Sequence, residues 1–374
     1  MSKTTLPDSV KFRLWGKAAG RCQYENCNEP LFYDELTKAE FNSAYIAHIY
    51  ADSEGGPRWD DSLSPRLRKD LSNLMLLCDR HHRLVDREQV AEHPAERLQE
   101  MKALHEERVA ILTAITPDKQ SHVILFGANI GQHQVPLNYR EAAYAMRLHR
   151  YPAGTSAIEL GLKNLAMADG EPGYWEMQEK QLLEMFNRQV LPLKGNHRVQ
   201  HFSVFGLAPM PLLVRLGTLL SDIFPADIYQ RQREPAGWEW QTHSERHRFI
   251  LNEPADCSHP PVLKISLSGQ IADERVRPVM GGPCSVWELT VNDPGNDFLR
   301  SRELLSEFRK ICRHAYDRIK FRHPHHDLLH VFPAMPVSAA LEFGRTRMPK
   351  ADLPMLLYDQ NKVNNCFVPT IKII

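Results

Sequence analysis

The chain has 374 residues, with 46 Lys and Arg against 46 Asp and Glu, 43% hydrophobic residues and 25% charged residues. This composition excludes wholesale disorder and fibrous repeats, and the length is enough for two or three domains. Because the formal net charge is zero, a nucleic-acid or phosphate partner must be bound by local basic patches rather than by a bulk positive field.

The N-terminal segment, MSKTTLPDSVKFRLWGKAAG, lacks the apolar run of a secretory signal peptide. No stretch of the chain approaches the ~18 uncharged apolar residues that a membrane-spanning helix needs. We therefore expect a cytoplasmic protein without a membrane span.

Three of the seven cysteines lie close to histidines in the first quarter of the chain. Cys22 and Cys27 form one close pair, and Cys78 and His81 form a second. Two such pairs can complete a tetrahedral Zn²⁺ site, and a segment this polar needs a staple of that kind to fold. The other cysteines are isolated from one another, and we expect buried thiols at Cys257, Cys284, Cys312 and Cys366.

The segment between these pairs predicts a hairpin followed by a helix. A strand over Ser43–Ile49 would carry His48 near its end, Asn73 would lie in the returning strand, and His82 would open the helix. His82 and Asp86 are four residues apart, so both would project from one helical face and could share a second, catalytic cation. Zinc bound by the two pairs would hold His48 and His82 across a gap the size of a phosphate.

This arrangement suits hydrolysis of a phosphodiester. A neutral imidazole is the natural base for the attacking water, because its unperturbed pKa of about 6.5 lies near working pH. A divalent cation offsets the charge that develops on the phosphate and on the departing 3′ oxygen. We therefore assign His48 as general base, His82 as a metal ligand and Asp86 as a weaker ligand. The amide of Asn73 would fix the orientation of the region around His48.

The stretches AHIYADSEGGPR (47–58) and NLMLLCDRHHRLVD (73–86) resemble the signatures of the His-Asn-His (HNH) endonucleases, which have the ββα-metal fold. The resemblance covers residues 15–90, and with it we expect Mg²⁺, or Mn²⁺ in its place, as the catalytic cation. Two positions depart from the family pattern. Ala47 replaces the Asp or His that many members use as an additional cation ligand, and His81 replaces a zinc-binding cysteine of several members.

Basic residues near this set could track DNA phosphates without reading the sequence. As a group beside a catalytic cation they are candidates for clamping the DNA backbone. The candidates are Arg58, Arg66, Arg68 and Lys69, with Arg80 and Arg83 beside the metal ligands.

A helix and a linker separate this region from the rest of the chain. Apolar residues recur at helical spacing over 95–112, and TAITPDKQS (113–121) then breaks the pattern with Pro117. We expect an α+β nuclease domain over 1–115 and an α/β domain over 116–374. In the second domain short apolar strands alternate with helical patterns, as in a fold with a largely parallel sheet.

The second domain contains a diverged duplication. VFGLAPMPLLVRLG (204–217) aligns without a gap with VFPAMPVSAALEFG (331–344), so that Gly217 matches Gly344 at an offset of 127. Upstream, AIELGL (157–162) matches VWELTV (286–291) at an offset of 129. We expect two Rossmann-like halves, about 120–255 and 256–374, related by pseudo-symmetry. Their strands would converge at their carboxyl ends and leave a groove there.

These stretches, together with HVFPAMPVSAALEFGR (330–345), resemble the SAVED domain, a fusion of two CARF-like halves that senses cyclic oligonucleotides. With the nuclease signature, the whole chain resembles the HNH-SAVED effector nucleases of bacterial CBASS antiphage defence. The resemblance implies a nuclease that is silent until a cyclic dinucleotide binds. It also implies assembly into a homo-oligomer, from dimer to tetramer, and indiscriminate degradation of double-stranded DNA.

A cyclic dinucleotide presents two flat bases and two phosphates, so its pocket needs aromatic faces and polar donors. Polar candidates lie on loops that follow strands: Asn129 and Gln132 in the first half, and Ser268 and Gln270 in the second. Trp175, in a Pro-Gly-Tyr-Trp turn, is a candidate for base stacking.

Two other functions fit the same sequence. A restriction-type HNH nuclease, with a C-terminal half that recognises DNA, would cut without a small molecule and give sequence-restricted products. A ligand-responsive DNA-binding protein with a purely structural zinc would keep its function without His48. The sequence has no Walker-type loop and no GxGxxG fingerprint, so an NTPase or a dinucleotide oxidoreductase has no support.

Overall fold

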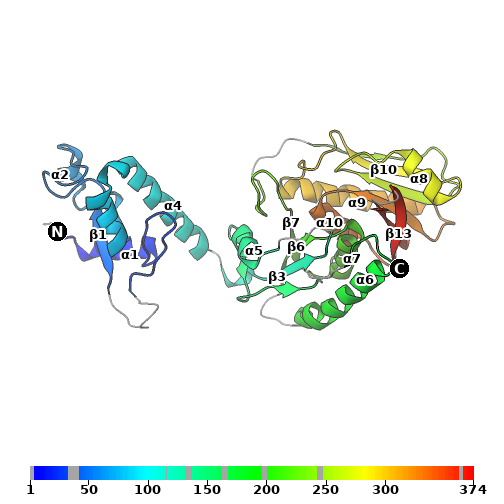
Figure 1. Cartoon of the computed structure of the whole chain (residues 1–374), viewed down its shortest axis with the longest axis horizontal. Helices are drawn as coiled ribbons and strands as arrows, with labels where there is room; N and C mark the ends of the chain where they lie inside the picture. The colour runs from blue at the N-terminus through cyan, green and yellow to red at the C-terminus, as the bar shows by residue number, and fades with distance from the viewer. Residues whose placement is uncertain are drawn as a thin grey trace. The chain divides into compact units, whose positions relative to one another are not determined.

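The computed structural model describes residues 4–32, 42–114, 116–130, 137–161, 167–195, 200–241, 247–361 and 365–374. The chain divides into two compact units, Met1–Thr116 and Pro117–Ile374, and each is considered by itself (Figure 1). Within the described ranges, no helix combines the length and the apolar character needed to cross a bilayer.

The N-terminal unit is built around two short antiparallel strands and a helix that follows them at once. β1 (Ala44–His48) pairs with β2 (Leu74–Cys78). β2 leads directly into α3 (Asp79–Arg83), which continues as a π-helical turn, η2 (Leu84–Glu88). The hairpin and the helix are therefore present as predicted, but the helix begins at Asp79, three residues before His82.

Asn73 lies in the structural element that precedes the returning strand, and not in the strand as expected. It ends a 3₁₀ turn, η1 (Leu71–Asn73), and does not belong to the returning strand. The side chain of Asp70 caps this turn by accepting a hydrogen bond from the Ser72 amide at 2.8 Å. The cap holds the chain in the turn, so β2 starts only at Leu74.

Helices pack around the hairpin. They are α1 (Asp8–Ala18), α2 (Leu63–Leu67) and α4 (Ala95–Thr113), with a 3₁₀ turn, η3 (Val90–Glu92), before the last of them. α4 confirms the helix predicted over 95–112. The apolar faces of these elements enclose a buried core that includes Leu14, Leu31, Leu76, Val85 and Leu98.

The C-terminal unit contains two largely parallel sheets. In the first, β3 (Gln120–Gly127), β6 (Phe202–Leu207) and β7 (Ala226–Tyr229) run parallel, and two short strands pair with β3 on its other side. The short strands are β4 (Tyr151–Pro152) and β5 (Ile158–Glu159). The accompanying helices and turns are η4 (Pro117–Lys119), α5 (Tyr139–Met146), α6 (Tyr174–Met185), η5 (Phe186–Val190), η6 (Leu191–Gly195) and α7 (Met210–Leu220).

The second sheet has the order β13-β12-β11-β9-β10-β8, with four parallel strands between two antiparallel edges. Its strands are β8 (Phe249–Asn252), β9 (Pro261–Ser266), β10 (Ser285–Val291), β11 (Leu329–Ala334), β12 (Met355–Asn361) and β13 (Cys366–Ile373). Its helices are α8 (Asp273–Met280), α9 (Arg302–Arg322) and α10 (Val337–Thr346). One hydrophobic core contains buried residues of both halves, including Phe202, Leu213, Trp287 and Leu341.

The strand order repeats between the two sheets. The first half has the parallel order β5-β3-β6-β7, and the second half has β10-β9-β11-β12 in the same sense. β6 and β11 each run into a proline, Pro209 or Pro336, that begins the next helix. The repeated topology agrees with the duplication predicted from the sequence. The predicted boundary between the halves, at about 255, comes too late in the chain, because β8 already pairs with β10 of the second sheet.

The two equivalent helices, α7 and α10, cross at the matched glycines. A Cβ atom on Gly217 would lie 2.1 Å from the carbonyl oxygen of Leu341, and one on Gly344 would lie 2.1 Å from that of Val214. Real Cβ atoms do not approach an oxygen so closely, so the helices pack backbone to backbone only because both positions are glycine.

Gly217→Ala is expected to destabilise the C-terminal unit by about 1–3 kcal/mol or more, because the added methyl group must push α7 away from α10. Denaturant unfolding of the full chain measures the loss. Gly16→Ala is the matched control, since a Cβ on this helical glycine of α1 would meet nothing within 4 Å. A Gly217→Ala protein as stable as the Gly16→Ala protein would contradict the tight crossing.

Of the four isolated cysteines, only Cys312 is buried as predicted, on the core face of α9. Cys257, Cys284 and Cys366 are half-buried. The expectation is wrong for these three because two lie in loops that flank β9 and β10, and the third starts the edge strand β13. The apolar character of a segment does not show whether its thiol lies in the core, in a loop or on an edge strand.

Candidate functional site

The four predicted zinc ligands come together in the N-terminal unit. The ligand atoms of Cys22, Cys27, Cys78 and His81 all lie within 4.8 Å of one another. Nδ1 of His81 lies 3.1 Å from Sγ of Cys78 and 3.6 Å from Sγ of Cys22. Tetrahedral Zn²⁺, with bonds of about 2.0–2.3 Å, needs ligand atoms roughly 3.5 Å apart. The donor set and its spacing therefore fit a zinc ion.

Electrostatics within the cluster favours the metal-binding form of one thiol only. The hydrogen bond with Cys78 and burial raise the pKa of Cys22, and burial raises the pKa of Cys27. A side-chain hydrogen bond with Cys22 holds the pKa of Cys78 well below its usual range, and the nearby His81 acts in the same direction. Cys78 is thus a thiolate at neutral pH, which is the form that binds zinc.

The cluster joins segments that are far apart in the sequence. Cys22 and Cys27 lie in the loop after α1, Cys78 ends β2, and His81 lies in α3. The Tyr24 ring stacks on the His81 ring with centroids 4.1 Å apart. This stacking fixes the plane of the imidazole. It also joins the loop after α1, which carries Tyr24, to α3, which carries His81.

The ring of His48 is oriented by a backbone carbonyl. Its Nε2 lies 3.0 Å from the carbonyl oxygen of Arg68, the residue that follows α2. Because a carbonyl oxygen only accepts hydrogen bonds, Nε2 carries the hydrogen, and Nδ1 keeps the lone pair that can take up a proton. His48 is 8% exposed, so this nitrogen lies in a largely enclosed site.

The Asn73 amide holds the segment that follows His48. Its Oδ1 accepts a hydrogen bond from the Tyr50 amide at 2.7 Å, and its Nδ2 donates to the Tyr50 carbonyl at 3.0 Å. Nδ2 also lies within hydrogen-bonding distance, 3.3 Å, of the Leu67 carbonyl at the end of α2. Asn73 is almost fully buried. The side chain thus links both ends of the segment that orients the His48 ring.

His82 and Asp86 face each other on the helical turn that follows β2. Nε2 of His82 lies 3.3 Å from Oδ2 of Asp86. Adjacent ligand atoms on one cation, each about 2.1 Å from it, are separated by a similar distance. These two residues therefore fit a shared divalent cation, and Ala47 adds no ligand.

The charge and orientation of this pair are set by neighbouring groups. Burial alone would raise the pKa of Asp86, but the hydrogen bonds of its carboxylate to His82 and Arg58 outweigh burial and lower the pKa. Asp86 is therefore ionised at neutral pH. The ring of Tyr45, on β1, stacks on the His82 ring with centroids 4.6 Å apart.

Arg58 is not placed to contact DNA, which corrects the expectation from the sequence. Its side chain is only 7% exposed, and Nη2 donates to Oδ1 of Asp86 at 2.6 Å. Its other nitrogens donate to the carbonyls of Ile49 and Val85, at 2.7 and 2.9 Å. The guanidinium is held inside the unit because the chain turns back on itself at Arg58, which has a positive φ of 57°.

The remaining basic candidates differ in exposure. Arg66 and Lys69 are exposed, whereas Arg68 is half-buried beside the carbonyl that binds His48. The sequence did not predict the roles of Arg58 and Tyr45. The available signal was the GGPR segment, in which Gly55 and Arg58 both adopt positive φ.

Asn129, Ser268 and Gln270 follow the carboxyl ends of central strands, whereas Trp175 lies in the first turn of α6 and not in a loop turn as expected. Asn129 follows β3, and its carbonyl accepts a hydrogen bond from the Tyr174 hydroxyl at 2.9 Å. Ser268 follows β9, and its amide donates to the last residue of β11, Ala334, at 2.8 Å. Trp175 is half-buried against the core, and Gln270 is exposed. Gln132 lies outside the described residues.

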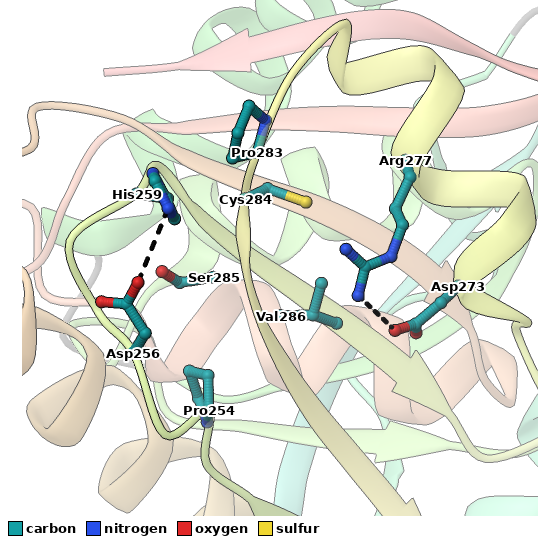
Figure 2. A pocket seen from close by; sticks show the side chains of 9 residues that line it. All are labelled: Pro254, Asp256, His259, Asp273, Arg277, Pro283, Cys284, Ser285 and Val286. Atoms are coloured by element: carbon teal, nitrogen blue, oxygen red, sulfur yellow. Dashed lines mark hydrogen bonds and ion pairs between the residues drawn. The ribbon is translucent and has the colours of Figure 1, made fainter.

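A cavity of about 390 Å³ opens at the opposite end of the second sheet (Figure 2). Two ion pairs line it, Asp256 with His259 at 3.5 Å and Asp273 with Arg277 at 3.3 Å. The thiol of Cys284 lies between the two pairs (Figure 2). Because the cavity borders the first residues of β10, it is distinct from the predicted ligand groove.

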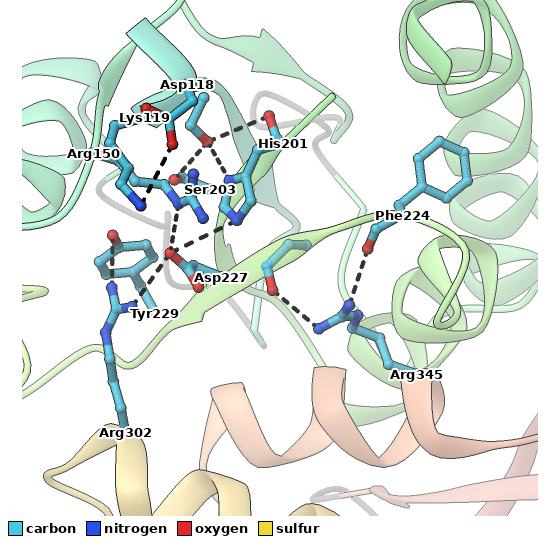
Figure 3. A network of polar contacts seen from close by, with 12 residues as sticks. Asp118, Lys119, Arg150, His201, Ser203, Phe224, Asp227, Tyr229, Arg302 and Arg345 are labelled. Atoms are coloured by element: carbon cyan, nitrogen blue, oxygen red, sulfur yellow. Dashed lines mark hydrogen bonds and ion pairs between the residues drawn. The ribbon is translucent and has the colours of Figure 1, made fainter. Parts of the chain in front are cut away.

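A polar network centred on Asp227 joins the two halves (Figure 3). Oδ2 of Asp227 lies 3.0 Å from Nε of Arg150 and 3.3 Å from Nη1 of Arg302, which belongs to α9 of the second half. Arg302 also donates to the Tyr229 hydroxyl at 3.0 Å. Burial lowers the pKa of the neighbouring His201 to about 4, so this imidazole is neutral at pH 7. Strand β7 is therefore anchored to the second half by charged groups.

Comparison with known proteins adds a family and several solved structures. A family model described as "SMODS-associated and fused to various effectors sensor domain" (SAVED) matches residues 182–373. The chain is similar to the Acinetobacter baumannii Cap4 SAVED/CARF-domain containing receptor with the cyclic trinucleotide 2′3′3′-cAAA, at 12% identity and a TM-score of 0.41. With 3′3′3′-cAAA, the same receptor matches at 13% identity and a TM-score of 0.44.

The Moraxella osloensis Cap4 SAVED/CARF-domain containing receptor matches at 14% identity and a TM-score of 0.41. Each match covers 76% of this chain, which spans 61% of the Acinetobacter receptor in both complexes and 63% of the Moraxella receptor. No curated protein matches the chain.

Proposed function

The chain belongs to the SAVED family of sensor domains, and we propose on this premise that its C-terminal unit binds a cyclic oligonucleotide and thereby controls a metal-dependent HNH endonuclease in its N-terminal unit. The activator would be a cyclic dinucleotide, and the substrate would be double-stranded DNA that is cut without sequence preference. Such a protein would serve antiphage defence of the CBASS type in the cytoplasm, with zinc as a structural ion and Mg²⁺ or Mn²⁺ as the catalytic ion.

One observation carries the nuclease proposal. Nη2 of Arg58 lies 3.5 Å from the carbonyl oxygen of His48 and 2.6 Å from Oδ1 of Asp86. A single nitrogen atom thus borders both the strand end that carries the proposed base and the helical turn that carries the proposed metal ligands. Hydrolysis of one phosphodiester linkage requires the base and the cation ligands to lie near each other, and this contact supports the proposal because it brings together the two segments that carry them.

In the proposed reaction, His48 accepts a proton at Nδ1 from the water that attacks phosphorus. Its Nε2 hydrogen bond to Arg68 keeps the ring in the required orientation. The bond between phosphorus and the 3′ oxygen then breaks. A divalent cation held by His82 and Asp86 supplies, when bound, stabilisation of the charge on the phosphate and on that oxygen. The exposed Arg66 and Lys69, with Arg68, would contact flanking DNA phosphates.

In the proposed sensor, the cyclic nucleotide lies in the groove beyond the carboxyl ends of the strands in both halves, near Asn129, Trp175, Ser268 and Gln270. Binding can change activity only if the ligand prefers one arrangement of the protein over another. We infer that the ligand-bound SAVED surface favours a homo-oligomer, from dimer to tetramer, in which the nuclease units become active.

The test is incubation of plasmid DNA with the full chain, Mg²⁺ and a panel of cyclic di- and trinucleotides, with light scattering on the same samples. We expect cleavage only with one panel member, together with an increase in mass. Cleavage without any nucleotide, giving discrete fragments, would instead favour the restriction-type nuclease. DNA binding without cleavage under every condition would favour the non-enzymatic DNA-binding protein. An unchanged mass alongside strong activation would exclude the oligomer route.

A further inference from the structure

The buried Arg58 contacts both sides of the proposed catalytic site. The chain leaves β1 after His48, runs through a glycine turn, and returns the Arg58 side chain to the interior, where only 7% of it is exposed. Arginine carries five donors in a planar fork, so it can bind several acceptors at fixed angles. At this position all of its nitrogens are directed at groups within the unit.

The contacts divide between two segments of the chain. Toward the strand end, Nε donates to the Ile49 carbonyl at 2.7 Å, and Nη2 lies 3.5 Å from the His48 carbonyl. Toward the helical turn, Nη1 donates to the Val85 carbonyl at 2.9 Å, and Nη2 donates to Oδ1 of Asp86 at 2.6 Å. The same side chain therefore fixes the distance between the two segments.

The contact between Arg58 and Asp86 also decides which oxygen of the Asp86 carboxylate is available to bind a cation. Oδ1 is engaged by Arg58, whereas Oδ2 lies 3.3 Å from Nε2 of His82. A carboxylate free to rotate could bind a cation through both oxygens or turn away from His82. With Oδ1 engaged, Asp86 presents one oxygen in a fixed direction.

We propose that Arg58 is a positioning residue for the cation site. It holds Asp86 so that Oδ2 and His82 Nε2 face one cation, and it holds that pair against the strand end that carries His48. This inference rests on the proposed nuclease function, but it concerns cation geometry and can be tested apart from DNA cleavage.

The experiment uses Arg58→Lys in the full chain. Lysine keeps the positive charge but has one nitrogen, which cannot reach both segments in the geometry of the guanidinium fork. We expect the affinity for Mn²⁺, measured without DNA by electron paramagnetic resonance titration, to fall about 10- to 100-fold. Cleavage of plasmid DNA should fall by a comparable factor. Zinc content should stay unchanged, because Arg58 does not contact the cysteine cluster.

The matched control is Arg87→Lys. Arg87 follows Asp86 directly and is exposed, so its variant should bind Mn²⁺ and cut DNA like the unchanged protein. His82→Ala is a second control, which gives the Mn²⁺ affinity expected when a cation ligand is lost. If Arg58→Lys does not fold at the assay temperature, Arg58→Gln, which keeps a donor but not the fork, takes its place with the same expected loss.

The outcomes separate this proposal from the nuclease proposal. Normal Mn²⁺ affinity in the folded Arg58→Lys protein overturns the positioning role, even if its thermal stability is lower. The positioning role is also overturned if the unchanged protein binds no Mn²⁺ at the site formed by His82 and Asp86. If Mn²⁺ binds and depends on Arg58 while the unchanged protein cuts no DNA, the positioning role stands and the nuclease proposal fails.

Discussion

His48→Ala is expected to slow DNA cleavage by about 10²- to 10⁴-fold, the usual contribution of a general base. The variant loses the one ring nitrogen that can accept the proton of the attacking water, while the cation ligands and the zinc cluster stay in place. His48→Gln sharpens the test, because its amide Nε2 can still donate to the Arg68 carbonyl but cannot act as a base. Initial rates on supercoiled plasmid, with saturating activator and Mg²⁺, measure the effect.

His105→Ala is the matched control for this prediction. His105 lies in the same unit, is 6% exposed, and places Nε2 3.0 Å from the Ala18 carbonyl, so it resembles His48 in burial and in bonding. It lies on α4, outside the proposed site. Its replacement should cost stability and leave the cleavage rate of the folded protein unchanged. Equal rates for the His48→Ala and His105→Ala proteins would remove His48 from the mechanism.

Loss of zinc is expected to unfold the N-terminal unit. Structural zinc sites in small domains contribute apparent binding free energies of about 10 kcal/mol or more, which is larger than the stability of such a unit. Cys22→Ser or Cys78→Ser should therefore abolish the zinc content of the chain, expected to be one ion, and leave residues 4–114 open to proteolysis. The C-terminal unit has its own core and should resist the protease.

Cys284→Ser is the control, because this half-buried thiol lies in the C-terminal unit and belongs to no metal-binding cluster among the described residues. Its zinc content, measured by atomic emission, should match that of the unchanged chain. If the N-terminal unit still resists the protease after a chelator has removed the zinc, the cluster is not required for the folding of this unit.

Local spacing explains which parts of the fold could be predicted. The cysteine pair, the hairpin pattern and the helix before the linker depend on residues close in sequence, and the structure contains each of them. The duplicated halves could be predicted because the matched segments keep nearly the same offset, 127 and 129 residues. Hydrophobic periodicity does not separate a strand from the capped turn before it, so the pattern places Asn73 in the returning strand although it ends the turn.

The role of Arg58 could not be predicted, because it depends on two features that no local pattern records. One is the positive φ at Arg58, which turns the side chain inward. The other is the charge of Asp86, a partner 28 residues away. A basic residue in a polar segment beside the proposed nuclease site fits a DNA contact equally well until the turn is known.

The glycine crossing has a consequence for the origin of the C-terminal unit. The Val214 carbonyl faces Gly344, and the Leu341 carbonyl faces Gly217, so each contact is the copy of the other. Two separate chains, each containing one half, could make both contacts around a true two-fold axis, as isologous interfaces do. The crossing thus has the form of an isologous interface between two copies of one half, as a self-associating ancestor would have had. Gene fusion would then have replaced an encounter that depends on concentration with a permanent tether.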